Sequence, residues 1–326
     1  MLQRVWHSLG DPKFGLMNTL SDGIARCEDL QPGLIPDLRK SRALIVASDY
    51  GGHHQESRFE SYSFLIIDGV QWAQWETART RVRHTYRLGK RRFAFKGMGD
   101  RRKARALPAF LSAADMLHGL CATILVEKSL QSLFREHGRL QLSDTHLQAF
   151  AHYDARTFER LLRTVHLLSF LLGGLSGPGQ DALWITDQDE IAANPERLTE
   201  LTRIFADVSG HYLPHDLGHL RCATAASDNG TLEMEDLLSI ADLTAGALAE
   251  MATAYAGQGG FPKTVIAPHP VGLSRKARQI IEWFSVLGMP LSRTAHAIRP
   301  GGRSPGLVIS HFRFHWGRPL SGTSPS

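Results

Sequence analysis

Hydrophobic and polar positions along the chain predict short strands that alternate with longer helices. Apolar, β-branched runs followed by turn residues predict strands over 42–48, 60–67, 121–127, 182–186, 219–225 and 307–314. Apolar residues at helical spacing predict helices over 71–86, 107–119, 195–208, 233–254 and 273–287. A longer helix is expected from a cap at Ser143 to about Leu172, and a further short strand over 91–95.

The order of these elements favours one α/β domain. Two strands come early and close together, and the later strands alternate with helices, which is typical of a mixed sheet with helices on both faces. Residues 1–40 contain several turn formers and are expected to form an N-terminal extension. The domain itself is expected over 41–326, with a basic insertion at about 71–105 and a C-terminal helix-strand element.

Composition places the chain among soluble globular proteins. Its 326 residues are 43% hydrophobic, enough for a buried core without disulfides. Cys27, Cys121 and Cys222 lie far apart and are odd in number, so they form neither a disulfide framework nor a CxxC zinc site. The start of the chain has no apolar run typical of a signal peptide, and the apolar stretch 165–175 is too short to span a bilayer. A cytoplasmic protein is expected.

The net charge of +5 conceals a strongly uneven distribution. Between Arg79 and Arg105 there are 12 basic residues and one acidic residue, Asp100, while the rest of the chain carries 25 basic and 31 acidic residues. A basic segment of this density, with Tyr86, Phe93 and Phe95 among its charges, favours nucleic-acid contact over a merely solvated face or a membrane surface. The residues expected to bind DNA or RNA are Arg79, Arg81, Arg83, Arg87, Lys90, Arg91, Arg92, Arg101, Arg102, Lys103 and Arg105.

Three acidic residues stand out by their positions. Asp49 and Asp187 each follow a predicted buried strand, at the rim of the sheet where α/β proteins place their sites. Asp242 lies in the apolar part of a predicted helix, where a carboxylate is costly to bury without a partner. A converging cluster needs a metal ion or protonation of some members, and hard oxygen ligands suit Mg²⁺ or Mn²⁺. A turn or cap role for Asp49 or Asp187, and an arginine partner for Asp242, remain open.

These residues resemble a known group. Asp49-Tyr50-Gly51-Gly52 after its strand is similar to the D-E-S-G opening of a bacterial RNase H-like family, the domain of unknown function 3800. The late helix of that family, typically Q-x-A-D-x-x-A-G, is similar to the segment 240–247, which contains Asp242 and Gly246. Lys96 resembles part of a short polar motif in the same family. The resemblance covers roughly residues 42–315.

The resemblance implies phosphodiester hydrolysis with two divalent ions, Mg²⁺ or Mn²⁺, held by Asp49, Asp187 and Asp242. RNase H-like enzymes usually add a further acidic residue, for which Asp115, Glu235 and Asp189 are candidates. Lys96 is either a phosphate-neutralising catalytic residue or one more backbone contact. The basic segment would hold the nucleic acid beside the acidic centre.

A second hypothesis is a non-catalytic nucleic-acid-binding subunit of a larger assembly, with a partner such as an ATPase. It follows from Tyr50, which stands where the family has Glu and removes one candidate metal ligand. A role in anti-phage defence or mobile elements is expected by association alone. The choice between DNA and RNA and the oligomeric state lie beyond the sequence.

Overall fold

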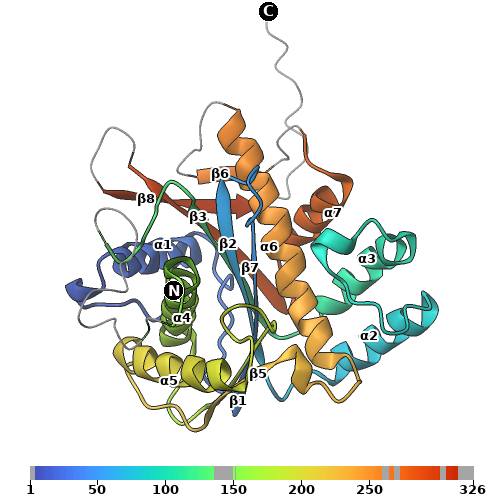
Figure 1. Cartoon of the computed structure of the whole chain (residues 1–326), viewed down its shortest axis with the longest axis horizontal. Helices are drawn as coiled ribbons and strands as arrows, with labels where there is room; N and C mark the ends of the chain where they lie inside the picture. Colours follow the sequence, from blue (N-terminus) through green and yellow to red (C-terminus); the bar gives the residue numbers. More distant parts are fainter. Residues whose placement is uncertain are drawn as a thin grey trace, which may run out of the picture.

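A computed structural model of the chain describes residues 4–135, 150, 152–258, 264–267, 272–301 and 306–314. Its centre is an eight-stranded sheet in the order β5-β4-β1-β2-β3-β7-β8-β6 (Figure 1). The strands are β1 (Ala43–Gly51), β2 (Phe59–Asp68), β3 (Gly119–Glu127), β4 (Asp181–Thr186), β5 (Leu220–Thr224), β6 (Thr264–Ala267), β7 (Leu291–Pro300) and β8 (Leu307–Phe314).

The sheet is mixed. β1, β2 and β3 form an antiparallel meander, whereas β4 lies parallel beside β1 and β5 lies parallel beside β4. Beyond β3 the sheet continues with β7 in parallel, β8 antiparallel to β7, and β6 parallel to β8.

Helices cover both faces of the sheet (Figure 1). One core contains side chains of α1, α4 and α5, and the other contains side chains of α2, α3, α6 and α7. The predicted α/β class, with a mixed sheet flanked by helices on both faces, is confirmed. The helices are α1 (Leu16–Leu30), α2 (Ala73–Thr85), α3 (Arg101–Ala114), α4 (Ala155–Leu175), α5 (Pro195–Tyr212), α6 (Glu233–Gly257) and α7 (Arg275–Phe284).

Strand alternation decides which helices each side chain meets. In β1, Ile45 and Ala47 belong to the core under α6, whereas Leu44, Val46 and Tyr50 belong to the core under α4. Among the described helices, α6 is long and apolar enough to cross a membrane, but most of it is buried inside the protein. It packs against β1, β2 and α7 in the core of its layer.

Several predicted elements differ from the structure. Residues 91–94 form no strand, and a 3₁₀ turn (Phe95–Gly97) follows them. α3 begins at Arg101 because Asp100 caps it, so Pro108 lies inside the helix rather than in its first turn. The predicted cap Ser143 lies outside the described residues, and α4 begins at Ala155.

Three elements were not predicted at all. α1 lies in the segment expected to be an extension, and its side chains share the core of α4, as does Trp6. The division of the chain at residue 40 stays a prediction. β6 and β7 were also missed, and with β8 they widen the sheet beyond β3.

Candidate functional site

The register of β1 and β4 brings two of the predicted acidic residues together. Ser48 pairs with Thr186 in the parallel ladder, and Asp49 and Asp187 are the next residues of their chains. Side chains alternate along a strand, and Ile45, Ala47 and Ile185 all belong to the core under α6. By the same alternation Asp49 and Asp187 lie at neighbouring strand ends on the α6 side of the sheet.

Helix α6 carries the third acidic residue across this face. Ser61 Oγ of β2 donates to the carbonyl oxygen of Ala245 at 2.8 Å, and the hydroxyls of Ser63 and Thr244 are 2.9 Å apart. These bonds fix the middle of α6 over the ends of β1 and β2. Asp242, one turn earlier, is half-buried and accepts a 2.5 Å hydrogen bond from the backbone N–H of Phe95.

The three carboxylates are close enough for their charges to oppose one another. Burial raises the pKa of Asp49 well above its usual range, and the negative charges of Asp242, Asp187 and Asp189 raise it further. The pKa of Asp242 is raised to about 6, chiefly by burial and also by Asp187, against the Phe95 N–H and the more distant Lys276 and Lys103, which lower it.

The donor chemistry of this group fits a divalent cation. Each carboxylate has one oxygen fixed by a backbone N–H: Asp49 by Tyr50 at 2.5 Å, Asp187 by Gln188 at 2.8 Å, and Asp242 by Phe95. None of the three forms an ion pair with a described side chain, so oxygen donors and negative charge are both left over for Mg²⁺ or Mn²⁺. In the described part of the chain, however, no three His, Cys, Asp or Glu side chains are arranged as a complete metal site.

The further acidic candidates occupy different places. Asp189 lies beside the group, and burial raises its pKa to about 6. Glu235 is near enough to feel the charge of Asp187 but is ion-paired with Arg92 at 2.6 Å. Asp115 precedes β3, which runs parallel to β1, so it lies at the opposite end of the sheet.

Asp115 has a structural role at that opposite end. It accepts a 2.8 Å hydrogen bond from the indole N–H of Trp283 and is ion-paired with Arg293. The structure therefore separates Asp115 from Asp49, Asp187 and Asp242, and the expectation that it adds a ligand there is corrected. Spacing along the chain carried no information about which end of the sheet α3 would reach.

Tyr50 faces away from the acidic group. Its ring lies in the core under α4, and its hydroxyl is 2.8 Å from Ser48 Oγ and 3.3 Å from Thr186 Oγ1. Position 50 therefore points to the other face of the sheet from Asp49. The replacement of the family Glu by Tyr50 does not take a carboxylate from the face that carries Asp49, Asp187 and Asp242.

Phe95 and Gly246 connect the basic segment to α6. A Cβ atom added to Gly246 would meet the Phe95 ring at 2.3 Å, so only glycine admits this contact. The ring of Phe95 therefore lies directly against the backbone of α6 at Gly246. Lys276 Nζ lies 4.0 Å from the ring centroid and donates to the Phe95 carbonyl oxygen at 2.9 Å. Lys96 itself is exposed.

Part of the basic segment is used inside the protein. Arg79 is only 2% exposed and donates to Asp236 at 3.1 Å, and Arg83 is bonded to the same carboxylate. These two arginines are therefore removed from the expected nucleic-acid surface. Phe93 is also inaccessible, because it stacks on Phe110 in the core at a centroid distance of 4.1 Å.

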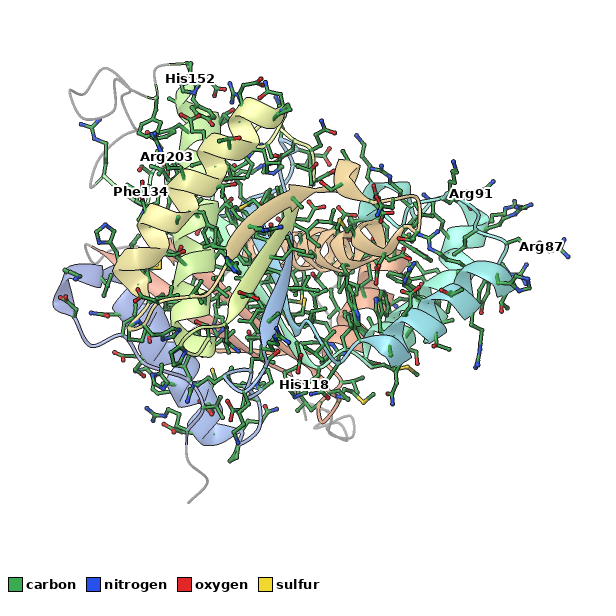
Figure 2. All side chains as sticks on the ribbon, turned by 90° about the horizontal axis from the view of Figure 1, so that it is seen from below. Arg87, Arg91, His118, Phe134, His152 and Arg203 are labelled. Carbon is green, nitrogen blue, oxygen red and sulfur yellow. The ribbon has the colours of Figure 1, made fainter. Side chains whose placement is uncertain are left out.

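The remaining cations form what we call the basic surface, on α2, α3 and the segment between them. Arg91 pairs with Asp100 at 3.4 Å, and Lys103 is half-buried. Figure 2 shows Arg87 and Arg91 projecting from this side, opposite His152 and Arg203 on the α4–α5 side. The exposed members that form no ion pair with a described side chain are Arg81, Arg87, Lys90, Lys96, Arg101, Arg102 and Arg105.

Sequence reasoning missed Lys276 as a neighbour of the site. The Ser274 cap and the buried Ala277, Ile280 and Ile281 indicate helix α7. Nothing in that pattern shows that α7 docks against Phe95, because the contact depends on tertiary packing alone.

Comparisons with known proteins find a likeness among the solved structures. No family model and no curated protein sequence matches the chain. The crystal structure of ribonuclease H2 from Pyrococcus horikoshii OT3 is similar over 73% of this chain and 97% of its own, with 13% sequence identity and a TM-score of 0.30. The class defined here, an α/β protein with a mixed sheet between two helix layers, rests on the strand order and cores described above.

Proposed function

We propose that this protein is a divalent-metal-dependent nuclease that hydrolyses phosphodiester bonds through Asp49, Asp187 and Asp242. The observation that carries the proposal is the meeting of three carboxylates, without cationic partners among the described side chains, at one rim of an RNase H-like sheet. The basic surface on the same side of the sheet supplies sequence-independent phosphate contacts. The motifs around Asp49 and Asp242 support membership of the domain of unknown function 3800 family.

The residues of the chain prepare the site for its metal. Asp49, Asp187 and Asp242 would hold Mg²⁺ or Mn²⁺, which when bound supplies an activated water and stabilises the leaving oxygen. The backbone N–H groups of Tyr50, Gln188 and Phe95 each fix one carboxylate oxygen and leave the other free. Lys276 and Lys103 offset part of the negative charge around Asp242.

Cleavage of a labelled panel tests the proposal. Single- and double-stranded DNA, RNA and a hybrid are incubated with Mg²⁺, Mn²⁺ or EDTA, using wild-type protein, Asp242→Asn and the matched control Asp207→Asn. Asp207 is exposed on α5 and forms no ion pair with a described residue. We expect metal-dependent cleavage that falls at least about a hundredfold in Asp242→Asn, because ligand loss removes charge stabilisation of the transition state. Wild-type cleavage by Asp242→Asn would refute the assignment.

A second candidate is a non-catalytic nucleic-acid-binding subunit that acts with a partner protein such as an ATPase. The observation that favours it is that the described acidic side chains do not converge into a coordination sphere. Salt-sensitive binding without metal-dependent cleavage of any substrate in the panel would support this candidate. In either case we propose that the protein works in the cytoplasm, where its three free cysteines stay reduced.

A further inference from the structure

A cavity of about 400 Å³ opens beside the acidic group, on the α4 side of the sheet. A second hollow of about 470 Å³ shares three of its lining residues, His53, Arg156 and Arg160, so the two form one continuous depression. We call this depression the α4 pocket. Its lining carries four cations, Lys128, Arg156, Arg160 and Arg163, and four carboxylates, Glu60, Asp154, Glu159 and Glu190.

The floor of the α4 pocket is a fixed ion network. Arg163, 4% exposed, donates to Glu159 at 2.8 Å and to Glu60 at 3.2 Å. It also donates to the carbonyl oxygen of Leu130 at 3.0 Å. The charge of Arg163 is thus balanced by the two glutamates, and the network holds the wall of the pocket in place.

The cations above this floor are less well balanced. Lys128 Nζ donates to the carbonyl oxygen of His54 at 2.7 Å, and Arg156 is exposed at the start of α4. Neither forms an ion pair with a described side chain. Arg160 is bonded to Glu190 at 2.9 Å, and that carboxylate is itself 63% exposed, so the ion pair is screened by solvent.

His53 adds a neutral donor to these cations. Arg160 Nη2 lies 3.4 Å from His53 Nδ1, and since a guanidinium can only donate, Nδ1 accepts and the ring proton belongs on Nε2. Burial and then the positive charges of Arg160, Arg156 and Lys128 lower the pKa of His53 to about 4, against a raising effect of Glu60. The positive charges beside this buried, neutral ring would attract an anion.

The α4 pocket adjoins the acidic group. His53 follows Asp49 by four residues, through the Gly51–Gly52 turn. Glu190 follows Asp187 by three residues and accepts a 2.9 Å hydrogen bond from Arg160 in the pocket. The basic surface lies on the α6 side of the rim, and the cations of the α4 pocket lie on the other side.

We propose that the α4 pocket binds a phosphate group through Lys128, Arg156, Arg160 and the Nε2–H of His53. Its assignment to a phosphate of the nucleic-acid substrate rests on the proposed function, whereas the phosphate chemistry itself does not. Lysine and arginine heads together with a neutral imidazole donor match a phosphate, which offers several acceptor oxygens and charge. A strand that enters over the basic surface would then be held on both sides of the acidic group.

Isothermal titration of inorganic phosphate into the full-length protein, at constant ionic strength, tests the pocket directly. The variant is Lys128→Ala/Arg156→Ala, and the matched control is Arg26→Ala/Arg203→Ala, which removes the same charge from exposed positions on α1 and α5. We expect the pocket variant to bind phosphate at least about tenfold more weakly than the control, because it lacks two charge-assisted hydrogen-bond donors. Equal affinity in both variants, or no phosphate binding by wild type, would overturn the proposal.

Oligonucleotides with a 5′-phosphate or a 5′-hydroxyl then identify the source of the phosphate. Preference for the 5′-phosphate that disappears in the pocket variant supports a terminal phosphate, and an equal loss for both strands supports a backbone phosphate. Unchanged strand affinity despite weakened inorganic phosphate binding would overturn the assignment to the substrate. Failure of the nuclease proposal is seen separately, as cleavage by Asp242→Asn, and leaves the phosphate titration unaffected.

Discussion

At the scale of single residues, the site depends on backbone contacts that carry no charge. Phe95 is held by Gly246 and Lys276, and its N–H in turn holds Asp242. The carboxylate is therefore positioned by a segment more than a hundred residues earlier in the chain. A substitution that touches neither a carboxylate nor a basic residue should still disturb the site.

Gly246→Ala tests this dependence. The added Cβ meets the Phe95 ring at 2.3 Å, so ring and backbone must shift and the Phe95 N–H bond to Asp242 weakens. We expect a loss of about 1–3 kcal/mol in the free energy of unfolding, measured with urea, and reduced metal-dependent cleavage. Gly257→Ala on the same helix is the control, because its added Cβ meets nothing within 4 Å. Equal behaviour of the two variants would contradict the contact.

His166 on α4 makes the stability of the fold sensitive to acid. Burial, and then the charge of His211, lower its pKa from 6.5 to about 4, while its Nδ1 lies 3.0 Å from the Tyr212 hydroxyl. The unfolded chain therefore takes up the proton first, and stability is lost as pH falls from about 6.5 to about 4. We expect His166→Gln to reduce that loss by about 1–2 kcal/mol. Urea unfolding at pH 7 and pH 4.5 measures it, with the exposed His84→Gln as control.

At the scale of elements, apolar runs were enough to predict β1, β2, β3 and β4, because buried strands need them. α3 was misplaced because its first turn is a run of charges with no hydrophobic period, and its start depends on the Asp100 cap. The alternation of apolar Phe93 and Phe95 with other residues predicted a strand over 91–95. In the structure, Phe93 stacks on Phe110 and Phe95 packs against Gly246, without any strand pairing. β7 escaped prediction because Arg293 and His296 interrupt its buried apolar positions.

Within the candidate site too, local sequence patterns predicted some residues, whereas others depend on tertiary packing. Asp49 and Asp187 could be foreseen, since strand ends on one face of a parallel pair must meet. Asp242 could be foreseen because a carboxylate in the apolar part of a helix is costly to bury without a partner or a bound cation. The α4 pocket and Lys276 could not, because both arise where elements distant in sequence pack together.

Ion pairs between α2 and α6 hold these two helices together and so fix the position of the basic surface. Arg79 and Arg83 of α2 share the buried carboxylate of Asp236 on α6. Asp236→Asn removes the carboxylate partner of Arg83 and leaves Arg79 with Glu76 alone among the described carboxylates, so we expect a loss of about 3–5 kcal/mol in the free energy of unfolding by urea titration. Asp207→Asn, at an exposed position, should change stability by less than about 0.5 kcal/mol. A loss no larger than that of the control would show that the network is dispensable.

At the scale of the whole molecule, positive and negative charges are concentrated in different regions. The segment from Arg79 to Arg105 contributes a net charge of +11, and the rest of the chain contributes −6. Part of the positive charge of the segment is neutralised by ion pairs with Asp236 and Glu235. The exposed remainder gathers on one flank of the acidic rim, and the α4 pocket lies on the other. A polyanion that approaches the rim therefore meets positive charge first, which steers it toward carboxylates that would otherwise repel it.

Salt dependence of nucleic-acid binding measures this arrangement quantitatively. Arg101 and Arg105 lie one helical turn apart on α3, both exposed, so their replacement by Ala removes charge without uncovering core. Removal of one cation that neutralises a phosphate should reduce the slope of log affinity against log salt by about 0.9 for duplex DNA, so the double variant should reduce it by nearly 2. Arg26→Ala/Arg203→Ala carries the same change in net charge on the opposite layer and should keep the wild-type slope. If both double variants lowered the slope equally, binding would follow net charge alone and the basic surface would lose its assigned role.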